Sequence, residues 1–277
     1  MEIGTLSETR PEVEAVVVAN EAVPLDHFPS LRLVANFGVG YDRIDMAACA
    51  ARGIAVTNTP GVLDAATADL AFALILAVRR RLVEGDGLVR AGRWSGSWSE
   101  GFLGREVAGA TLGIVGLGRI GSSVARRARA FDMRVLYTGR TQRQTELAEF
   151  LPLDDLLAES DIVTIHAPRT PETETLLDAR RLALLRDGAC IVNTARGEIV
   201  DEQALVRELV SGRLSAGLDV FAHEPHVPDE LTELPNVVLT PHIGSATVET
   251  RAAMTRLVVD NVLAAERGET LLTPVVG

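Results

Sequence analysis

A short apolar strand that runs into a glycine-rich turn and then a helix constrains this chain more than any other feature. Leu112 to Val115 reads as the strand, Gly116-x-Gly118-x-x-Gly121 as the turn, and the apolar positions beyond it recur at helical spacing. Gly116 allows the sharp turn, Gly118 lets the backbone approach a pyrophosphate, and Gly121 lets helix and strand pack closely. The bare N–H groups and positive dipole end of that helix favour a bound diphosphate. The stretch therefore predicts a dinucleotide-binding unit.

Further apolar runs alternate with helical segments along the rest of the chain. We expect strands at 13–19, 31–37, 54–57, 112–115, 134–138, 161–166, 189–194, 216–220 and 237–239, and helices at 45–52, 67–81, 201–211 and 247–267. Such alternation predicts an α/β fold with a doubly wound parallel sheet. We place a dinucleotide-binding domain at 67–246. A smaller α/β domain comprises 1–66 and, because the long last helix is expected to pack back onto it, 247–277.

Composition and charge limit the possible partners. The net charge of −11 argues against nucleic acid and anionic membranes, since both require a basic surface. Cys49 and Cys190, the only two cysteines, lie in apolar settings and are expected to be buried thiols in a reducing compartment. No metal site is expected. The first residues lack the basic and apolar runs of a signal peptide, and the most apolar stretch is too short to span a bilayer, so a cytoplasmic location is predicted.

The turn after the strand 134–138 indicates which dinucleotide is bound. NAD-type sites carry an Asp or Glu about twenty residues beyond the glycine motif, where it receives the ribose 2′-hydroxyl. This chain has Gly139 there, followed by Arg140, Thr141 and, two residues later, Arg143. Replacing a carboxylate by a guanidinium favours a 2′-phosphate. We therefore expect NADP(H) to be preferred and NAD(H) to be possible; the alternative is a solvated turn that binds neither phosphate.

Three side chains that follow predicted strands form a candidate catalytic set: Arg196, Glu224 and His242. The carboxyl ends of parallel strands converge on the dinucleotide crevice, so these groups are expected to meet there. Arg196 suits binding a substrate carboxylate and polarising a carbonyl, and His242 suits proton donation to the oxygen that forms. A carboxylate at Glu224 would favour the protonated imidazole. The set fits reduction of a 2-oxo acid. The remaining histidines are interpreted as structural: His27, His166, His223 and His226.

Motifs over nearly the whole chain resemble those of the D-isomer-specific 2-hydroxyacid dehydrogenases. They include Gly116-Leu-Gly-Arg-Ile-Gly121, Thr194-Ala-Arg-Gly197, Gly217-Leu-Asp-Val220, Glu224-Pro225 and Thr240-Pro-His-Ile-Gly-Ser245. Within that family, Asn36-Phe-Gly-Val-Gly-Tyr-Asp42, Thr57-Asn-Thr-Pro-Gly61, Ala66-Thr-Ala-Asp-Leu-Ala-Phe-Ala-Leu74 and Leu136-Tyr-Thr-Gly-Arg140 are similar to glyoxylate and hydroxypyruvate reductases.

The resemblance implies a Rossmann cofactor domain, a flavodoxin-like substrate domain and reduction of glyoxylate to glycolate or of hydroxypyruvate to D-glycerate. Arg196, Glu224 and His242 would be catalytic. The amides of Val39 and Gly40 would bind the substrate carboxylate, and Asp219 the nicotinamide carboxamide. Trp98 would lie near the substrate pocket of the partner in a homodimer. Cofactor contacts are expected from Gly116, Gly118, Arg119, Ile120, Gly121, Arg140, Thr141, Thr67, Thr194, Asp219 and Gly244.

The beginning of the chain departs from the family pattern. Family members have two further strands and a helix before the strand that 13–19 resembles, so the substrate domain is expected to be shortened and 13–19 to form a bare, apolar edge. Two alternatives to the reductase remain: a dehydrogenase of another D-2-hydroxy acid, and a non-catalytic dinucleotide-binding module. Both keep the fold.

Overall fold

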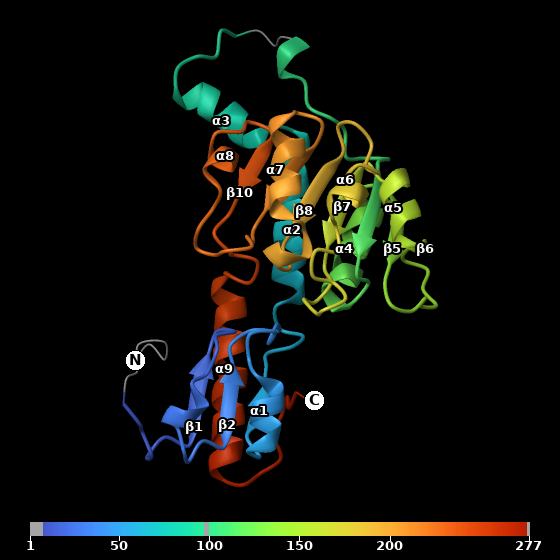
Figure 1. Cartoon of the computed structure of the whole chain (residues 1–277). Helices are drawn as coiled ribbons and strands as arrows, with labels where there is room; N and C mark the ends of the chain where they lie inside the picture. The colour runs from blue at the N-terminus through green and yellow to red at the C-terminus, as the bar shows by residue number, and fades with distance from the viewer. Residues whose placement is uncertain (1–7, 97–99, 276–277) are drawn as a thin grey trace. The chain divides into compact units, whose positions relative to one another are not determined.

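The computed structural model describes residues 8–96 and 100–275, and the chain forms two compact units (Figure 1). The larger unit comprises Ala65–Gly244, and the smaller one combines Met1–Asp64 with Ser245–Gly277. Among the described residues, no helix has both the length and the apolar character that a membrane span requires. We keep the assignment of a dinucleotide-binding domain to the larger unit and of a substrate domain to the smaller one as a proposal.

The larger unit is built on a parallel sheet with the order β10-β9-β8-β7-β4-β5-β6. The central strands are almost completely buried, as expected for parallel strands that helices cover on both faces. Their bounds are Thr111–Val115 (β4), Arg134–Thr138 (β5), Glu149–Phe150 (β6), Ile162–Ile165 (β7), Cys190–Asn193 (β8), Ser215–Leu218 (β9) and Val237–Leu239 (β10).

Helices cover this sheet in two layers because alternate side chains of each strand point to opposite faces. One face packs with α2 and α4 into one core, and the other packs with α5, α6 and α7 into a second core. The helices of this unit are α2 (Asp64–Arg79), α3 (Leu82–Arg90), α4 (Arg119–Ala130), α5 (Leu153–Glu159), α6 (Ala179–Leu182), α7 (Glu202–Val210) and α8 (Asp229–Thr232), with 3-10 turns η3 (Glu100–Phe102) and η4 (Gly197–Ile199). The expected doubly wound α/β fold is confirmed.

The smaller unit has a parallel sheet with the order β1-β2-β3. Its elements are β1 (Ala15–Val18), η2 (Leu25–His27), β2 (Leu33–Asn36), α1 (Met46–Ala51), β3 (Ala55–Thr57) and α9 (Val248–Glu266). The α9 helix packs against β2 through Val258, which shares a core with Leu33 and Ala35. β1 forms an edge of the described sheet, and its Val17 is 51% exposed; the bare apolar edge stays a prediction.

Two differences from the sequence-based expectations concern α2 and the edge of the large sheet, and the short helices α5, α6 and α8 were not expected either. The helix expected at 67–81 ends at Arg79, and a separate helix, α3, begins at Leu82. The break lies at Arg81, whose φ of 52° no helix interior can hold. The second difference is β6, a two-residue strand that pairs with β5 and was not expected.

Candidate active site

His242 and Glu224 form a direct pair in the larger unit. The imidazole Nδ1 of His242 lies 2.8 Å from Oε2 of Glu224, and the two side chains are 50% and 26% exposed. Burial alone would raise the pKa of the Glu224 carboxyl. The hydrogen bond and charge of His242, the Phe221 amide and the charge of Arg196 outweigh burial and lower this pKa below its usual range. The carboxylate therefore remains negative beside the imidazole at neutral pH.

Arg196 lies in the loop after β8, next to the loop that carries Glu224. Its charge contributes to the lowered pKa of Glu224, so the two side chains are in electrostatic range. Two features fix this loop. The side chain of Asn193 donates to the Arg196 carbonyl at 2.8 Å and accepts from the Ala195 amide at 3.0 Å. A side chain at position 197 would collide with the backbone of Phe221, so only Gly197 allows the two loops this close approach.

Asp219 holds the turn that carries His242. Its fully buried carboxylate accepts hydrogen bonds from the Thr240 hydroxyl at 2.7 Å and from the amides of Ile243 and Gly244, both at 2.8 Å. Burial raises the pKa of Asp219, and these three donors with the charge of His242 offset part of that rise. Its main-chain carbonyl also accepts the His242 amide at 2.9 Å. Asp219 thus positions His242 through the backbone.

The glycine motif forms the cradle that its spacing predicts. Gly116 has a φ of 97°, and a side chain there would collide with the backbone after β7; a side chain at Gly121 would collide with the Gly116 carbonyl. Gly118, by contrast, faces open space, with nothing within 4 Å of an added Cβ. No side chain of the described residues caps α4, which begins with Arg119 and Ile120. The amides at the start of α4 are therefore available for a phosphate, and the cradle fits a dinucleotide.

Of three other predicted cofactor residues, Thr194 and Gly244 follow the carboxyl ends of β8 and β10, and Thr67 lies in α2 beside Gly244. Thr67 of α2 is buried, and a Cβ on Gly244 would lie 3.4 Å from the Thr67 methyl carbon and 3.3 Å from a carboxylate oxygen of Asp219. The Thr194 hydroxyl is enclosed and has no hydrogen-bond partner among the described residues. A buried hydroxyl without a partner is costly, and a ligand group is one way to satisfy it.

The turn after β5 is held by a buried tyrosine that was not singled out from the sequence. The Tyr137 hydroxyl accepts the Arg143 amide at 2.6 Å and donates to the Arg143 carbonyl at 3.0 Å. Gly139, Arg140 and Thr141 are exposed on this turn. The charge of Arg140 also contributes, after local hydrogen bonds, to the lowered pKa of the exposed Glu172. Within the described ranges, no hydrogen bond or ion pair joins the Arg140 side chain to another predicted site residue.

The loop with Val39 and Gly40 belongs to the smaller unit and is described by itself. The side-chain amide of Asn36 donates to the carbonyls of Gly38 at 3.1 Å and Gly40 at 2.8 Å, and that of Asn58 donates to the Val39 carbonyl at 3.0 Å. The amides of Val39 and Gly40 have no acceptor within the described ranges. Two adjacent backbone amides, in a loop whose carbonyls are held in place, can both donate hydrogen bonds to a carboxylate. Asn36 and Asn58 lie inside motifs quoted above, but the sequence did not indicate their positioning role.

Trp98, His166 and the two cysteines were also singled out from the sequence. Trp98 lies outside the described residues. His166 is half-buried, with its Nε2 2.9 Å from the Thr164 hydroxyl, and desolvation of its ring lowers its pKa to about 3, which fits the structural interpretation. Cys49 and Cys190 are buried free thiols, as expected. Within the described ranges, no three His, Cys, Asp or Glu side chains are grouped for a metal ion.

Comparisons with known proteins show which proteins the chain as a whole is similar to. A family model described as D-isomer specific 2-hydroxyacid dehydrogenase, NAD binding domain, matches residues 72–244. The glyoxylate reductase of Pyrococcus horikoshii is 51% identical over 271 residues, which cover 93% of this chain and 81% of that protein.

Solved structures show the same likeness. An NADPH-dependent glyoxylate/hydroxypyruvate reductase from Sinorhizobium meliloti, in complex with NADP and malonate, superposes with a TM-score of 0.92 at 40% identity, covering 99% of this chain and 87% of that one. The D-lactate dehydrogenase of Aquifex aeolicus, complexed with NAD and lactic acid, gives 0.89 at 32% identity and covers 96% and 88%.

Proposed function

Because the chain belongs to the D-isomer-specific 2-hydroxyacid dehydrogenase family, we propose that it is an oxidoreductase that reduces glyoxylate to glycolate and hydroxypyruvate to D-glycerate with NADPH. The observation that carries this proposal is the 2.8 Å contact between His242 and Glu224, which lie after strand ends and within electrostatic range of Arg196. A relative at 51% identity that is a glyoxylate reductase supports the choice of substrate.

In the proposed reaction, the reduced nicotinamide supplies a hydride when bound. Arg196 binds the carboxylate of the 2-oxo acid and polarises its carbonyl, because a guanidinium stabilises the negative charge that develops on oxygen. His242 donates a proton to that oxygen and is left neutral. Glu224 stays ionised and stabilises the protonated imidazole before the transfer. The amides of Val39 and Gly40 add hydrogen bonds to the substrate carboxylate.

The cofactor residues are assigned on the same grounds. The cradle of Gly116, Gly118 and Gly121 with the first amides of α4 holds the pyrophosphate, and Thr194 and Asp219 lie at the strand ends that the nicotinamide half reaches. Arg140 on its exposed turn favours the 2′-phosphate of NADPH. The Sinorhizobium meliloti relative is NADPH-dependent, whereas the Aquifex aeolicus relative is complexed with NAD, so family membership alone does not choose between them.

The test is the rate of NADPH oxidation by the purified chain with glyoxylate, hydroxypyruvate and pyruvate, in parallel with NADH. Turnover that is fastest with glyoxylate or hydroxypyruvate supports the proposal, whereas a preference for pyruvate favours another D-2-hydroxyacid dehydrogenase. The His242→Ala variant should lose kcat by about 10²–10⁴-fold, the usual contribution of a general acid, and keep its NADPH affinity. Wild-type chain that binds NADPH but turns over none of these acids is a non-catalytic binding module.

Two further expectations belong to the proposal. The chain acts in the cytoplasm and forms a homodimer through its cofactor units, as the family resemblance implies. The side chains of Leu82, Val83 and Val89 on α3 support an interface, since each is more than half exposed. Light scattering of the purified chain, which should give twice the mass of 29.6 kDa, tests this expectation.

A further inference from the structure

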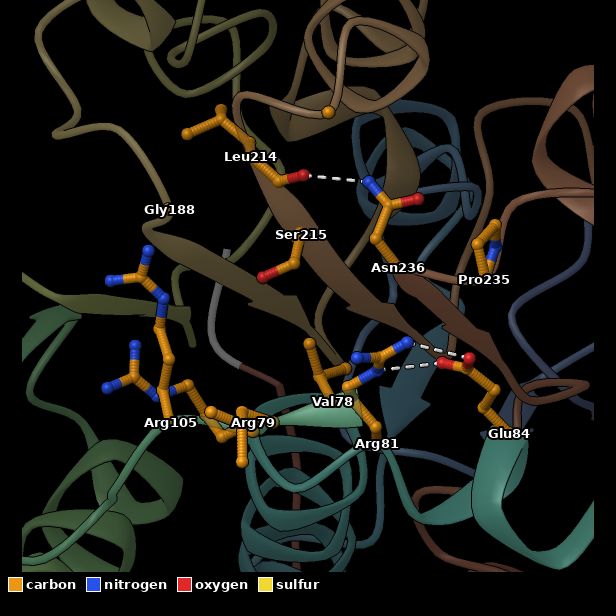
Figure 2. A pocket seen from close by; sticks show the side chains of 13 residues that line it. Val78, Arg79, Arg81, Glu84, Arg105, Gly188, Leu214, Ser215, Pro235 and Asn236 are labelled. Carbon is orange, nitrogen blue, oxygen red and sulfur yellow. Dashed lines mark hydrogen bonds and ion pairs between the residues drawn. The ribbon is translucent and has the colours of Figure 1, made fainter. Parts of the chain in front are cut away.

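A cavity lies at the opposite end of the large sheet from His242. It has a volume of about 260 Å³ and lies wholly within the larger unit (Figure 2). Gly188 precedes β8, Ser215 begins β9 and Asn236 precedes β10, so the cavity is at the amino ends of these strands. The proposed reaction uses the carboxyl ends and assigns nothing to this cavity. Its charged lining consists of Arg79, Arg81, Arg105 and Glu84.

One of the three arginines is neutralised by the carboxylate. Arg81 donates from Nε at 2.8 Å and from Nη2 at 2.7 Å to the two oxygens of Glu84, as the dashed lines in Figure 2 show. Its Nη1 donates to the Gly101 carbonyl at 2.7 Å, and its guanidinium lies 4.4 Å from the centre of the Phe102 ring. Arg81 is therefore engaged, and the cavity keeps a net charge of about plus two from Arg79 and Arg105.

Arg79 is a buried cation that forms no ion pair with any described residue. Its side chain is only 9% exposed, and its Nη2 donates to the Glu106 carbonyl at 2.6 Å. Its Nε is enclosed and has no partner among the described residues, and none of these forms an ion pair with it. Burial lowers the pKa of Arg79, and the positive charge of Arg105 lowers it further, although Cys190 and Asp161 act in the opposite direction. A buried guanidinium in this state is stabilised by an anion.

Arg105 is held on the same wall by the backbone. Its amide donates to the Arg79 carbonyl at 2.7 Å, and its guanidinium lies over Gly188, where an added Cβ would meet it. Figure 2 shows the Arg79 and Arg105 guanidinium groups on the same side of the cavity, away from the Arg81–Glu84 pair. In the part of the chain that the structure describes, the Arg105 side chain makes no hydrogen bond or ion pair.

We propose that this cavity binds a small phosphate monoester between Arg79 and Arg105. A phosphate monoester carries a charge of about −1.5 to −2 at pH 7, which matches the unneutralised charge, and its terminal oxygens can accept from both guanidinium groups. The cavity is larger than a phosphate group needs, and Val78, Leu103 and Leu214 give it apolar surface for the organic part. The site is separate from the glycine cradle and does not depend on the proposed reaction.

Calorimetric titration of the full chain tests the site. Glycerol 3-phosphate, inorganic phosphate and acetate are titrated separately at constant ionic strength, with and without NADPH. We expect one glycerol 3-phosphate per chain, bound more tightly than inorganic phosphate and far more tightly than acetate, whether or not NADPH is present. The Arg105→Gln variant should bind it about tenfold or more weakly, because one charge-assisted contact is lost. Arg126→Gln, at an exposed arginine of α4 outside the cavity, is the matched control.

Several outcomes would overturn the proposal. Absence of binding by the wild-type chain, equal affinity in wild-type and Arg105→Gln chains, or equal weakening in Arg126→Gln would each do so. Tighter binding of inorganic phosphate than of the monoester would show that the apolar wall plays no part, and binding abolished by NADPH would place the phosphate in the glycine cradle instead. Melting temperatures of both variants, measured alongside, must equal that of the wild type. Arg105 is exposed, so its replacement leaves the cores intact.

Discussion

At the scale of single residues, the backbone of His242 is the most constrained part of the proposed site. Its φ of 51° lies in the left-handed region, which costs free energy for any residue with a side chain. The turn is nevertheless held, because Asp219 accepts from Thr240, Ile243 and Gly244 and from the His242 amide itself. The imidazole is thus presented to Glu224 by a backbone fixed before any substrate arrives.

Arg140 carries the prediction on cofactor choice. Arg140→Ala should weaken NADPH about tenfold or more, the value of one charge-assisted hydrogen bond to the 2′-phosphate, and leave NADH nearly unchanged, because NADH lacks that group. Fluorescence titration with both dinucleotides measures the two dissociation constants. Arg143→Ala, on the same exposed turn, serves as the control for a general loss of positive charge. Equal weakening of NADPH and NADH in Arg140→Ala would contradict the assignment.

Glu224 carries a prediction on pH. Its pKa in the folded chain is lower than in the unfolded chain, where about 4.3 is usual. The stability it contributes is therefore fully present above about pH 4.3 and is lost as the pH falls through the lower folded value. Glu224→Gln should melt below the wild type at pH 7, and the difference should shrink as the pH falls below about 4.3 and through the lower folded pKa. Thermal melts at pH 7, 5, 4 and 3 measure this, with Glu269→Gln at an exposed loop as control.

At the scale of elements, the β4–turn–α4 unit contains one glycine that folding requires and another that ligand binding requires. Gly121→Ala forces a methyl group against the Gly116 carbonyl and should destabilise the chain by about 1–3 kcal/mol. Gly118→Ala meets nothing in the folded chain, so its melting temperature should equal that of the wild type, while its NADPH affinity should fall by about tenfold. Melting curves and NADPH titrations of both variants test the pair. A Gly118→Ala chain with full NADPH affinity would show that the pyrophosphate lies elsewhere.

Most strands and the capped helices α1, α7 and α9 were predictable from the sequence, whereas the short capped helix α6 was not. Strands covered on both faces, such as β7 and β8, read as continuous apolar runs, and the starts of α1, α7 and α9 are marked by side chains that cap them: Asp45, Asp201 and Thr247. The α3 helix was not predicted, because it contains Gly85 and Gly87 and has no buried residue that would mark an apolar stripe. The short α5 and the two-residue β6 also lack a pattern long enough to recognise.

The two ends of the sheet differ in how far sequence reasoning reaches. Arg196, Glu224 and His242 each stand just after a strand, so the parallel direction of the strands is enough to predict that these side chains converge. Of these, the structure joins His242 to Glu224 directly. The sequence does not predict the cavity at the amino ends, because its lining residues come from four distant segments without a shared motif: Arg79, Arg105, Gly188 and Asn236. The roles of Asn36, Asn58 and Asn193 in holding their loops are not predicted for a different reason: their contacts depend on backbone geometry.

At the scale of the whole molecule, each compact unit encloses its own apolar cores. The two cores of the larger unit draw every member from residues 65–244, and those of the smaller unit draw theirs from both ends of the chain. Val275 donates its amide to the Val56 carbonyl at 2.8 Å, and Asn261 accepts from the amides of Leu272 and Thr273, at 3.0 Å and 3.2 Å. The smaller unit therefore requires both termini, whereas the larger one is continuous in sequence.

This division predicts that a fragment of residues 64–244 folds alone. It keeps all of α2 and both cores that cover the large sheet, so it should show one cooperative thermal transition and bind NADPH within about threefold of the full chain. It should not reduce glyoxylate, because the amides of Val39 and Gly40 that we assign to the substrate carboxylate are missing. Circular dichroism melts, NADPH titration and the oxidation assay measure the three properties against the full chain. A fragment without a cooperative transition would show that the larger unit needs the smaller one to fold, and a fragment with full turnover would remove Val39 and Gly40 from the site.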